Sequence, residues 1–157
     1  MTDDAVRKFL VVVDDTPEAK IALYYASRRA RHTGGQMTLL RVIEPGDFQH
    51  WASIEEVMRQ EAFEEAEQLM KGLAAQVQQN VGLFPEIVIR EGKKKDQILK
   101  LLSEDPAIRI LVLGAGSGKE GPGPLVSSLA GQMSSDFKIP ITVVPGTLSY
   151  DELDALS

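Results

Sequence analysis

The sequence predicts an α/β fold in which a parallel sheet of five strands is doubly wound, with helices on both faces. Short apolar runs rich in β-branched residues alternate with longer segments in which apolar residues recur at helical spacing. Five such runs occur, and each of the first four is followed by a helical segment. This alternation is typical of βαβ units, whose strands are parallel and whose crossovers are right-handed.

The predicted strands are bounded by charged residues, Gly or Pro. They cover residues 8–14, 36–45, 84–92, 107–114 and 139–146. The first helix is predicted to begin at Pro17, behind the cap Thr16, and to stop at Gly34–Gly35. The other helices are predicted over residues 54–80, 96–105 and about 124–136. The pattern favours a single flavodoxin-like domain over residues 1–146.

The long helix over residues 54–80 is predicted to bury one face. Its apolar residues recur at helical spacing, with glutamates and glutamines opposite. They are Ile54, Val57, Met58, Ala62, Ala66, Leu69, Leu73 and Val77.

Residues 147–157 form a C-terminal extension. Ser149 and Glu152 have the spacing of a capping box, and Leu148, Leu153 and Leu156 would form a small apolar face. Two interpretations are open: a short helix that docks on a dimer partner, and a frayed tail.

Composition and charge exclude several classes of protein. The 157 residues are 43% hydrophobic and 25% charged, with a formal net charge of −6 and a pI of about 5.0. An acidic chain repels a phosphodiester backbone, so we expect no nucleic-acid partner. No apolar run approaches the roughly 20 residues that a membrane-spanning helix needs. There is no cysteine, which favours a cytoplasmic protein.

A glycine-rich segment follows the fourth strand, at the edge of the sheet where ligands of doubly wound folds bind. It reads LVLGAGSGKEGPGPL over residues 111–125. It departs from a Walker A motif because Lys119 precedes Glu120 in place of Ser or Thr. As a dinucleotide fingerprint it is interrupted, because Pro122 and Pro124 surround its last glycine. A passive turn and an anion site built from backbone N–H groups both remain open.

Several stretches together resemble the universal stress protein family over about residues 7–146. They are VVVDDTPEAKIAL, LLRVIEP and the late segment LVLGAGS…LVSSLAGQMSSDFKIPITVVPG, in this order. Many members of that family bind ATP through the signature G-x-x-G, nine residues, then G-[ST]. The resemblance implies ATP, with Mg²⁺, as the ligand, with Asp14 and Val42 lining an adenosine pocket and the loop at Gly114 holding phosphates. It also implies a homodimer formed through the last strand.

The signature is matched in spacing and only partly in residue type. Gly114 stands at the first glycine, and Ser128 matches the final Ser or Thr. Ser117 and Ser127 stand where the family has glycine. The added Cβ can hinder the approach of the backbone to a phosphate, whereas the serine hydroxyl can donate a hydrogen bond to it. The candidate phosphate-binding residues are Gly114, Gly116, Ser117, Gly118, Ser127 and Ser128.

Two groups of charged residues at the same edge have two interpretations each. In the pair Asp14–Asp15, either Asp15 assists the cap of the first helix, or Asp14 accepts a hydrogen bond from an adenine or ribose group. Lys93–Lys95 precede a helix, where the dipole disfavours cations. They form either a solvated surface or, with Arg41 and Lys119, part of an anion site.

Three functions are open. The favoured one is a small cytoplasmic stress-response protein that binds ATP or a similar phosphate ligand. The second is a dimeric regulatory module of the same family that binds no nucleotide. The third, an enzyme acting on a phosphorylated metabolite, lacks catalytic residues, because His32 and His50 have no partners spaced for a triad or a metal site. We therefore expect neither a catalytic nor a metal site, although slow ATP hydrolysis is compatible with the first function.

Overall fold

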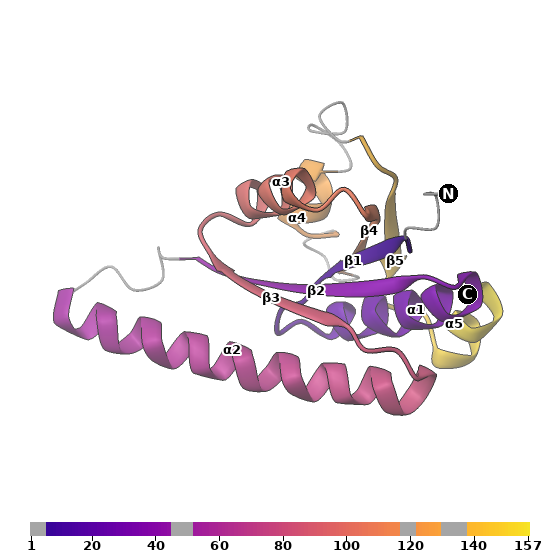
Figure 1. The fold of residues 1–157 in the computed structure, drawn as a ribbon, viewed down its shortest axis with the longest axis horizontal. Coiled ribbons are helices and arrows are strands. Elements are labelled where there is room, and N and C mark those ends of the chain that lie inside the picture. Colours follow the sequence, from indigo (N-terminus) through magenta and orange to yellow (C-terminus); the bar gives the residue numbers. More distant parts are fainter. Residues whose placement is uncertain (1–5, 45–51, 117–121, 130–137) are drawn as a thin grey trace.

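The computed structural model describes residues 6–44, 52–116, 122–129 and 138–157 (Figure 1). Its five strands form one sheet in the order β3-β2-β1-β4-β5, and every neighbouring pair is parallel. The strands are β1 (Lys8–Val12), β2 (Gln36–Ile43), β3 (Glu86–Glu91), β4 (Ile108–Ala115) and β5 (Ile141–Pro145). The order reverses between β1 and β4, which confirms the predicted doubly wound sheet.

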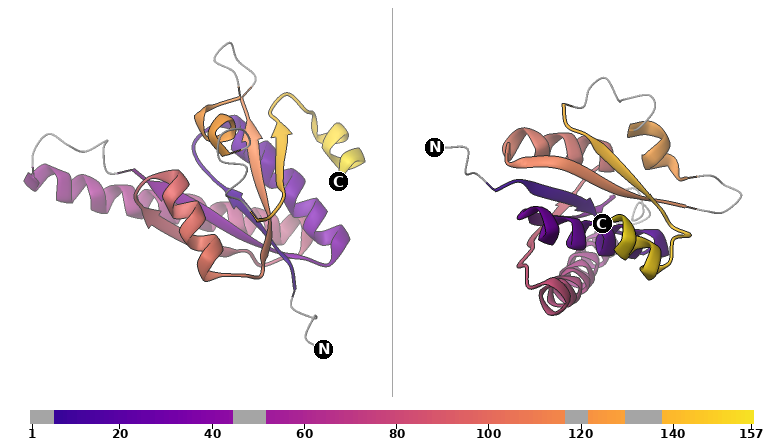
Figure 2. Two further views of the ribbon diagram at one scale, coloured as in Figure 1. Left: turned by 90° about the horizontal axis from the view of Figure 1, so that it is seen from above. Right: turned by 90° about the vertical axis from the view of Figure 1, so that its right-hand side faces the viewer.

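Helices cover both faces of this sheet (Figure 2). They are α1 (Pro17–Thr33), α2 (Ala52–Val81), α3 (Lys94–Glu104), α4 (Pro124–Ser127) and α5 (Tyr150–Leu156). α1 and α2 lie on one face, and α3 and α4 lie on the other. α3 begins at Lys94, earlier than predicted, so that Lys94 and Lys95 belong to its first turn. The helix expected over 124–136 is described as far as Leu129, and its remaining positions lie outside the described residues.

Alternate side chains of the central strand β1 enter two separate cores. Phe9 and Val11 pack with α1 and α2, whereas Leu10 and Val12 pack with α3 and α4. All four side chains are buried, as expected for a parallel strand covered on both faces. The carboxyl end of β1 therefore reaches the rim of the sheet between the two helical layers.

Local sequence accounts for both ends of α1. The Oγ1 of Thr16 accepts a hydrogen bond from the N–H of Ala19, 3.3 Å away. Gly34 has φ of 72°, and its N–H donates to the carbonyls of Ala30 and Arg31. A capping side chain contributes about 1 kcal/mol, and glycine takes the left-handed conformation without strain from a Cβ. The predicted bounds of this helix are confirmed.

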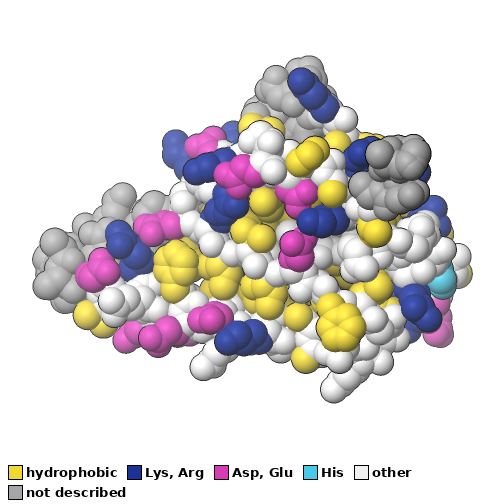
Figure 3. Space-filling model, in the orientation of Figure 1, with side chains coloured by type: hydrophobic (Ala, Val, Ile, Leu, Met, Phe, Trp, Pro, Cys, Tyr) yellow, Lys and Arg dark blue, Asp and Glu magenta, His cyan; other side chains and the backbone are white. Residues whose placement is uncertain are grey.

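The apolar face predicted for the long helix is buried over only part of its length. Ala66, Leu73 and Val77 are buried in the core with α1. Val57 and Met58 are 54% and 39% exposed, so the prediction was wrong at these positions. The physical reason is that α2 begins beyond the end of the sheet, where no strand covers it (Figure 1). Figure 3 shows hydrophobic side chains open to solvent on this side of the molecule.

The C-terminal segment forms a helix that packs on α1 of the same chain. Ser149 and Glu152 form a complete capping box, in which each side chain accepts a hydrogen bond from the other residue's backbone N–H. Leu153 is fully buried in the core formed with α1 and α2. The carboxylate of Asp154 accepts a hydrogen bond of 2.7 Å from the hydroxyl of Tyr24. α5 thus has both a local start signal and a tertiary contact.

An ion cluster joins three segments at the amino ends of the strands. The Nζ of Lys8 lies 2.8 Å from Asp105 Oδ2 and 2.6 Å from Glu86 Oε1. The buried Thr38 donates a hydrogen bond of 3.0 Å to the same oxygen of Glu86. The hydrogen bond to Asp105, and then the one to Glu86, raises the pKa of Lys8 above its ordinary value of 10.5.

Replacing this lysine tests the cluster. Lys8→Met is expected to lower the free energy of unfolding at pH 7 by about 1 kcal/mol. Because the folded-state pKa of Lys8 is raised, its contribution is complete below the unfolded pKa and is lost as pH rises through the folded pKa. Urea denaturation at pH 7 and above pH 10.5 should therefore show the difference between wild type and variant closing. A difference that persists at alkaline pH would indicate lost packing instead of lost charge.

Candidate functional site

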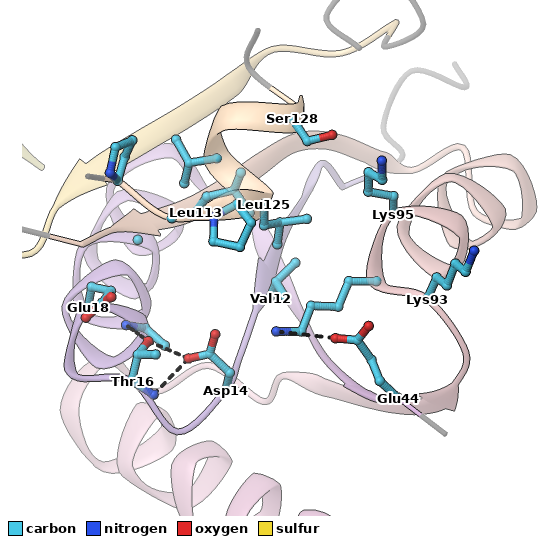
Figure 4. Close-up of a pocket in the computed structure, with 17 residues that line it drawn as sticks. Val12, Asp14, Thr16, Glu18, Glu44, Lys93, Lys95, Leu113, Leu125 and Ser128 are labelled. Carbon is cyan, nitrogen blue, oxygen red and sulfur yellow. Dashed lines mark hydrogen bonds and ion pairs between the residues drawn. The ribbon is translucent and has the colours of Figure 1, made fainter. Parts of the chain in front are cut away.

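A cavity of about 650 Å³ lies at the carboxyl ends of β1 and β4, where the strand order reverses (Figure 4). Ligands of doubly wound sheets bind at this position. The beginnings of α1 and α3 and the segment around α4 form its walls. Its apolar lining includes Val12, Leu113, Leu125 and Val126. These side chains form a surface of the kind that receives the flat face of a ligand, with polar groups around it.

Asp14 shapes the loop between β1 and α1. Its Oδ1 accepts two hydrogen bonds from Thr16, one from the backbone N–H at 2.9 Å and one from the hydroxyl. Asp15 lies near Arg41 instead, with 3.4 Å between carboxylate and guanidinium. The interpretation of Asp15 as an aid to the helix cap was therefore wrong, because Asp14 has that role. No described residue donates a hydrogen bond to Asp14 Oδ2, which leaves this oxygen for a ligand in the cavity.

Gly114 lines the cavity, and packing also requires a glycine there. A Cβ at this position would lie 2.6 Å from the backbone carbon of Glu18 and closer still to its oxygen. Backbone atoms cannot rotate away as the end of a side chain can. The absence of a side chain at Gly114 thus lets the first turn of α1 approach β4, whether or not a phosphate binds.

Two other predicted phosphate-binding residues do not line the cavity. The N–H of Gly116 donates to the carbonyl of Pro122 at 3.0 Å, which closes the base of the glycine-rich loop. Ser127 is exposed, and its N–H donates to the carbonyl of Gly123. Ser117 and Gly118 lie outside the described residues, as does Lys119.

A smaller hollow of about 440 Å³ adjoins the cavity on the side of α2. Val42 and Arg41 line this hollow and are absent from the wall of the main cavity. Three residues line both: Asp14, Glu44 and Lys94. Val42 is 4% exposed, which is close to the 5% of Val12 in the main cavity. Asp14 and Val42 thus line the same hollow, as expected for two residues of one adenosine pocket, and Asp14 also lines the main cavity.

Ser128 contributes a hydroxyl whose hydrogen-bonding capacity is unused. Its Oγ is buried and has no hydrogen-bond partner among the described residues. The side chain comes from the end of α4 and lines the cavity. A buried hydroxyl without a partner typically costs 1–3 kcal/mol, so a ligand oxygen placed here would be stabilising.

Lysines at the start of α3 line the cavity beside a carboxylate that follows β2. Lys93, Lys94 and Lys95 all line the cavity. Lys94 Nζ lies 4.0 Å from Glu44 Oε1, which is a loose ion pair (Figure 4). Glu44 was missed as a site residue, although its position directly after β2 was a signal that could have found it.

The described residues hold no group of three or more His, Asp or Glu side chains that could bind a metal ion. The Nδ1 of His32 lies 2.8 Å from the backbone oxygen of Ser157 and belongs to the contact between α1 and the C-terminus. His50 lies outside the described residues. No helix in the described part of the chain is both long and apolar enough to cross a bilayer.

Residues 5–145 match the model of the Universal stress protein family. The chain belongs to this family. The match covers the whole sheet and every wall of the cavity. A search of curated proteins gave no significant match.

Solved universal stress proteins have the same fold. UspA from Lactobacillus plantarum is 20% identical with a TM-score of 0.72, over 88% of this chain and 97% of that one. A universal stress protein in complex with cAMP is 14% identical with a TM-score of 0.65, over 92% and 100%. A family member from Arabidopsis thaliana with AMP bound is 17% identical with a TM-score of 0.60, over 88% and 91%. At these identities the likeness is one of fold.

The universal stress protein signature can be compared with this geometry residue by residue. The two positions that keep the signature residue type, Gly114 and Ser128, both line the cavity. Ser127, which replaces a signature glycine, points its exposed side chain elsewhere. The side chain of Ser127 therefore extends into solvent and does not obstruct the cavity.

Proposed function

We propose that this chain binds an adenine nucleotide, ATP in the first instance, in the cavity at the carboxyl ends of β1 and β4. The observation that carries the proposal is the convergence of Asp14, Gly114 and Ser128 on one cavity from three segments distant in the sequence. Its volume of about 650 Å³ falls in the range of roughly 300–1,000 Å³ typical of small-molecule sites. Related structures with AMP and with cAMP support an adenine nucleotide as the ligand class.

The polar and apolar groups suit the parts of such a ligand. Val12, Leu113 and Leu125 offer apolar contact for a base. The Oδ2 of Asp14 would accept a hydrogen bond from an adenine amino or ribose hydroxyl group. The Ser128 hydroxyl would donate to a phosphate oxygen. Mg²⁺ would reach the site with the phosphates, since the described residues provide no ligand cluster of their own.

Asp14→Asn tests the proposal without removing the loop's own hydrogen bonds. Asparagine keeps one oxygen to accept from Thr16 and replaces the free oxygen with an N–H₂ donor. Isothermal titration of nucleotide-stripped protein should give saturable ATP binding that weakens roughly tenfold in the variant, because a hydrogen bond to a charged group is lost. The thermal midpoint without ligand should stay close to that of wild type.

Asp15→Asn is the matched control, because Asp15 carries the same charge and is absent from the wall of the main cavity. It should leave ATP affinity nearly unchanged. Equal loss in both variants would indicate a general electrostatic effect and would contradict the role of Asp14. A flat titration of wild type at millimolar ATP would overturn the proposed function.

A specific observation favours a second candidate, a dimeric regulatory module that binds no nucleotide. Close packing on Glu18 explains the glycine at position 114, and the N–H of Gly116 already donates to the carbonyl of Pro122. Neither glycine therefore needs a bound phosphate to explain it. β5 pairs with β4 on one side only, and its other edge meets no strand among the described residues. A homodimer through β5, which we propose for both candidates, would cover that edge. A stable dimer by light scattering together with a flat nucleotide titration would favour this second function.

We propose binding and not catalysis as the role of the cavity. The Ser128 hydroxyl has no hydrogen-bonded base among the described residues, so it is not set up as a nucleophile. We also propose a cytoplasmic, regulatory role in which nucleotide occupancy biases association. A purified protein that releases phosphate from ATP at an enzymatic rate, about 1 s⁻¹ or faster, would contradict it.

A further inference from the structure

Three consecutive lysines form the wall of the cavity contributed by α3 (Figure 4). Lys94 is partly neutralised by Glu44, at 4.0 Å. Lys93 and Lys95 are exposed and form no ion pair with a residue in the described part of the chain. We name Lys93, Lys94 and Lys95 the lysine wall. It brings three positive charges to a concave surface in a chain whose formal net charge is −6.

The position of the lysine wall is unfavourable for the isolated fold. Lys93 is the N-cap of α3 and provides no side-chain hydrogen bond to the helix, although Ser, Thr, Asp or Asn at this position would. Lys94 and Lys95 add positive charge at the positive end of the helix dipole. Asp96 is the one acidic residue of the first turn. An anion bound in the cavity would reverse this unfavourable arrangement.

A second group on the same cavity also lacks a protein partner. The buried Oγ of Ser128 comes from α4, which packs on the same face of the sheet as α3. In Figure 4, Lys95 and Ser128 lie on the side of the cavity away from Asp14 and Glu18. The cavity therefore has a cationic side and an acidic side, and the free hydroxyl lies on the cationic one.

We propose that the lysine wall, with Lys95 as its principal member, is the anion subsite of this cavity and takes the polyphosphate end of the nucleotide. This inference rests on the proposed function and deepens it. The glycine-rich turn is a poorer anion site here, because Gly114 packs on α1 and the Gly116 N–H is used by Pro122. Side-chain charge thus takes the place of backbone contacts with the glycine-rich turn. The ligand class is a nucleoside polyphosphate, bound more tightly as phosphates are added.

The test compares Lys95→Gln with Lys100→Gln. Both remove one positive charge from exposed positions of α3, and glutamine is a good helix former, but only Lys95 lines the cavity. The probes are adenosine, ATP and inorganic tripolyphosphate, titrated by calorimetry at low and moderate salt. Lys95→Gln should weaken ATP and tripolyphosphate binding about tenfold, leave adenosine binding unchanged and flatten the salt dependence. Lys100→Gln should behave like wild type.

A measurement of stability keeps folding separate from binding. Without ligand, Lys95→Gln should melt at the same temperature as wild type or slightly higher, because a cation leaves the positive end of the helix. Tripolyphosphate should raise the melting temperature of wild type and Lys100→Gln more than that of Lys95→Gln. A lower midpoint of the ligand-free variant would mean that Lys95 stabilises the fold, which would overturn its assignment to a ligand.

The probes separate this inference from the proposed function. If wild type binds adenosine and binds ATP no more tightly, the inference is overturned, while the adenine site of the proposed function remains supported. Tripolyphosphate binding that depends on Lys95, without any adenosine or ATP preference, would support the inference and overturn the adenine ligand. Binding of none of the three probes to wild type would overturn both. Equal weakening in Lys95→Gln and Lys100→Gln would also overturn the inference, since it would indicate net charge alone.

Discussion

Gly114→Ala is expected to lower the free energy of unfolding by about 3 kcal/mol. The added Cβ would lie 2.6 Å from the backbone carbon of Glu18, and relief would require the first turn of α1 to move away from β4. That turn follows Thr16, which lines the cavity with Glu18. The variant should therefore lose ligand affinity together with stability. Urea denaturation, followed by a nucleotide titration under folding conditions, measures both.

Gly72→Ala is the matched control. Gly72 lies in the interior of α2 and is exposed, and a Cβ there would have no atom within 4 Å apart from its chain neighbours and the nearby backbone of the helix. Alanine should stabilise the protein there by about 0.5–1 kcal/mol, because glycine is a poor residue in a helix. The same chemical change thus has opposite signs at the two positions. A Gly114→Ala protein of wild-type stability that has lost only nucleotide binding would show that the glycine serves the ligand and not the packing.

Leu153→Ala is expected to cost about 3 kcal/mol of the free energy of unfolding. Leu153 is fully buried in the core that α5 shares with α1 and α2, so alanine would leave a cavity there. The hydrogen bond of Asp154 with Tyr24 and the capping box hold α5 in place and limit collapse around that cavity. Chemical denaturation monitored by far-UV circular dichroism measures the loss.

Leu156→Ala is the control for this second prediction. Leu156 belongs to the same helix but is 60% exposed, so its truncation should change the free energy of unfolding by no more than about 0.5 kcal/mol. Near-zero effects in both variants would mean that residues 149–157 are frayed in solution. Large effects in both would indicate that Leu156 is covered, as by a second copy of the chain.

Much of the fold could be predicted from the sequence because its signals are local. Thr16, Pro17 and Gly34 mark the ends of α1 through hydrogen bonds and backbone conformation within a few residues. Ser149 and Glu152 do the same for the start of α5. The exposed start of α2 could not be predicted, because helical spacing gives the face of a helix but not where the sheet beneath it ends.

The candidate site was only partly predictable. The rule that ligands bind at the carboxyl ends of parallel strands led to the correct edge of the sheet. The family resemblance then singled out Asp14, Gly114 and Ser128, and all three line the cavity. The same rule could not separate Asp14 from Asp15, since adjacent residues in a loop point in directions that the loop's own hydrogen bonds decide. Nor could it place Ser127 outside and Ser128 inside, which depends on how α4 packs against the sheet.

Local sequence patterns were sufficient to identify the strands and helices, most of their ends, and the parallel, doubly wound sheet that their order builds. These are consequences of apolar periodicity and of caps, and both act over short stretches of chain. The folded chain was needed to show that Gly114 faces the backbone of Glu18. It was also needed to show that the lysine wall shares a cavity with the hydroxyl of Ser128, which has no hydrogen-bond partner among the described residues. Such contacts depend on distances between segments far apart in the chain, which are set by packing across the sheet and leave no local pattern to read.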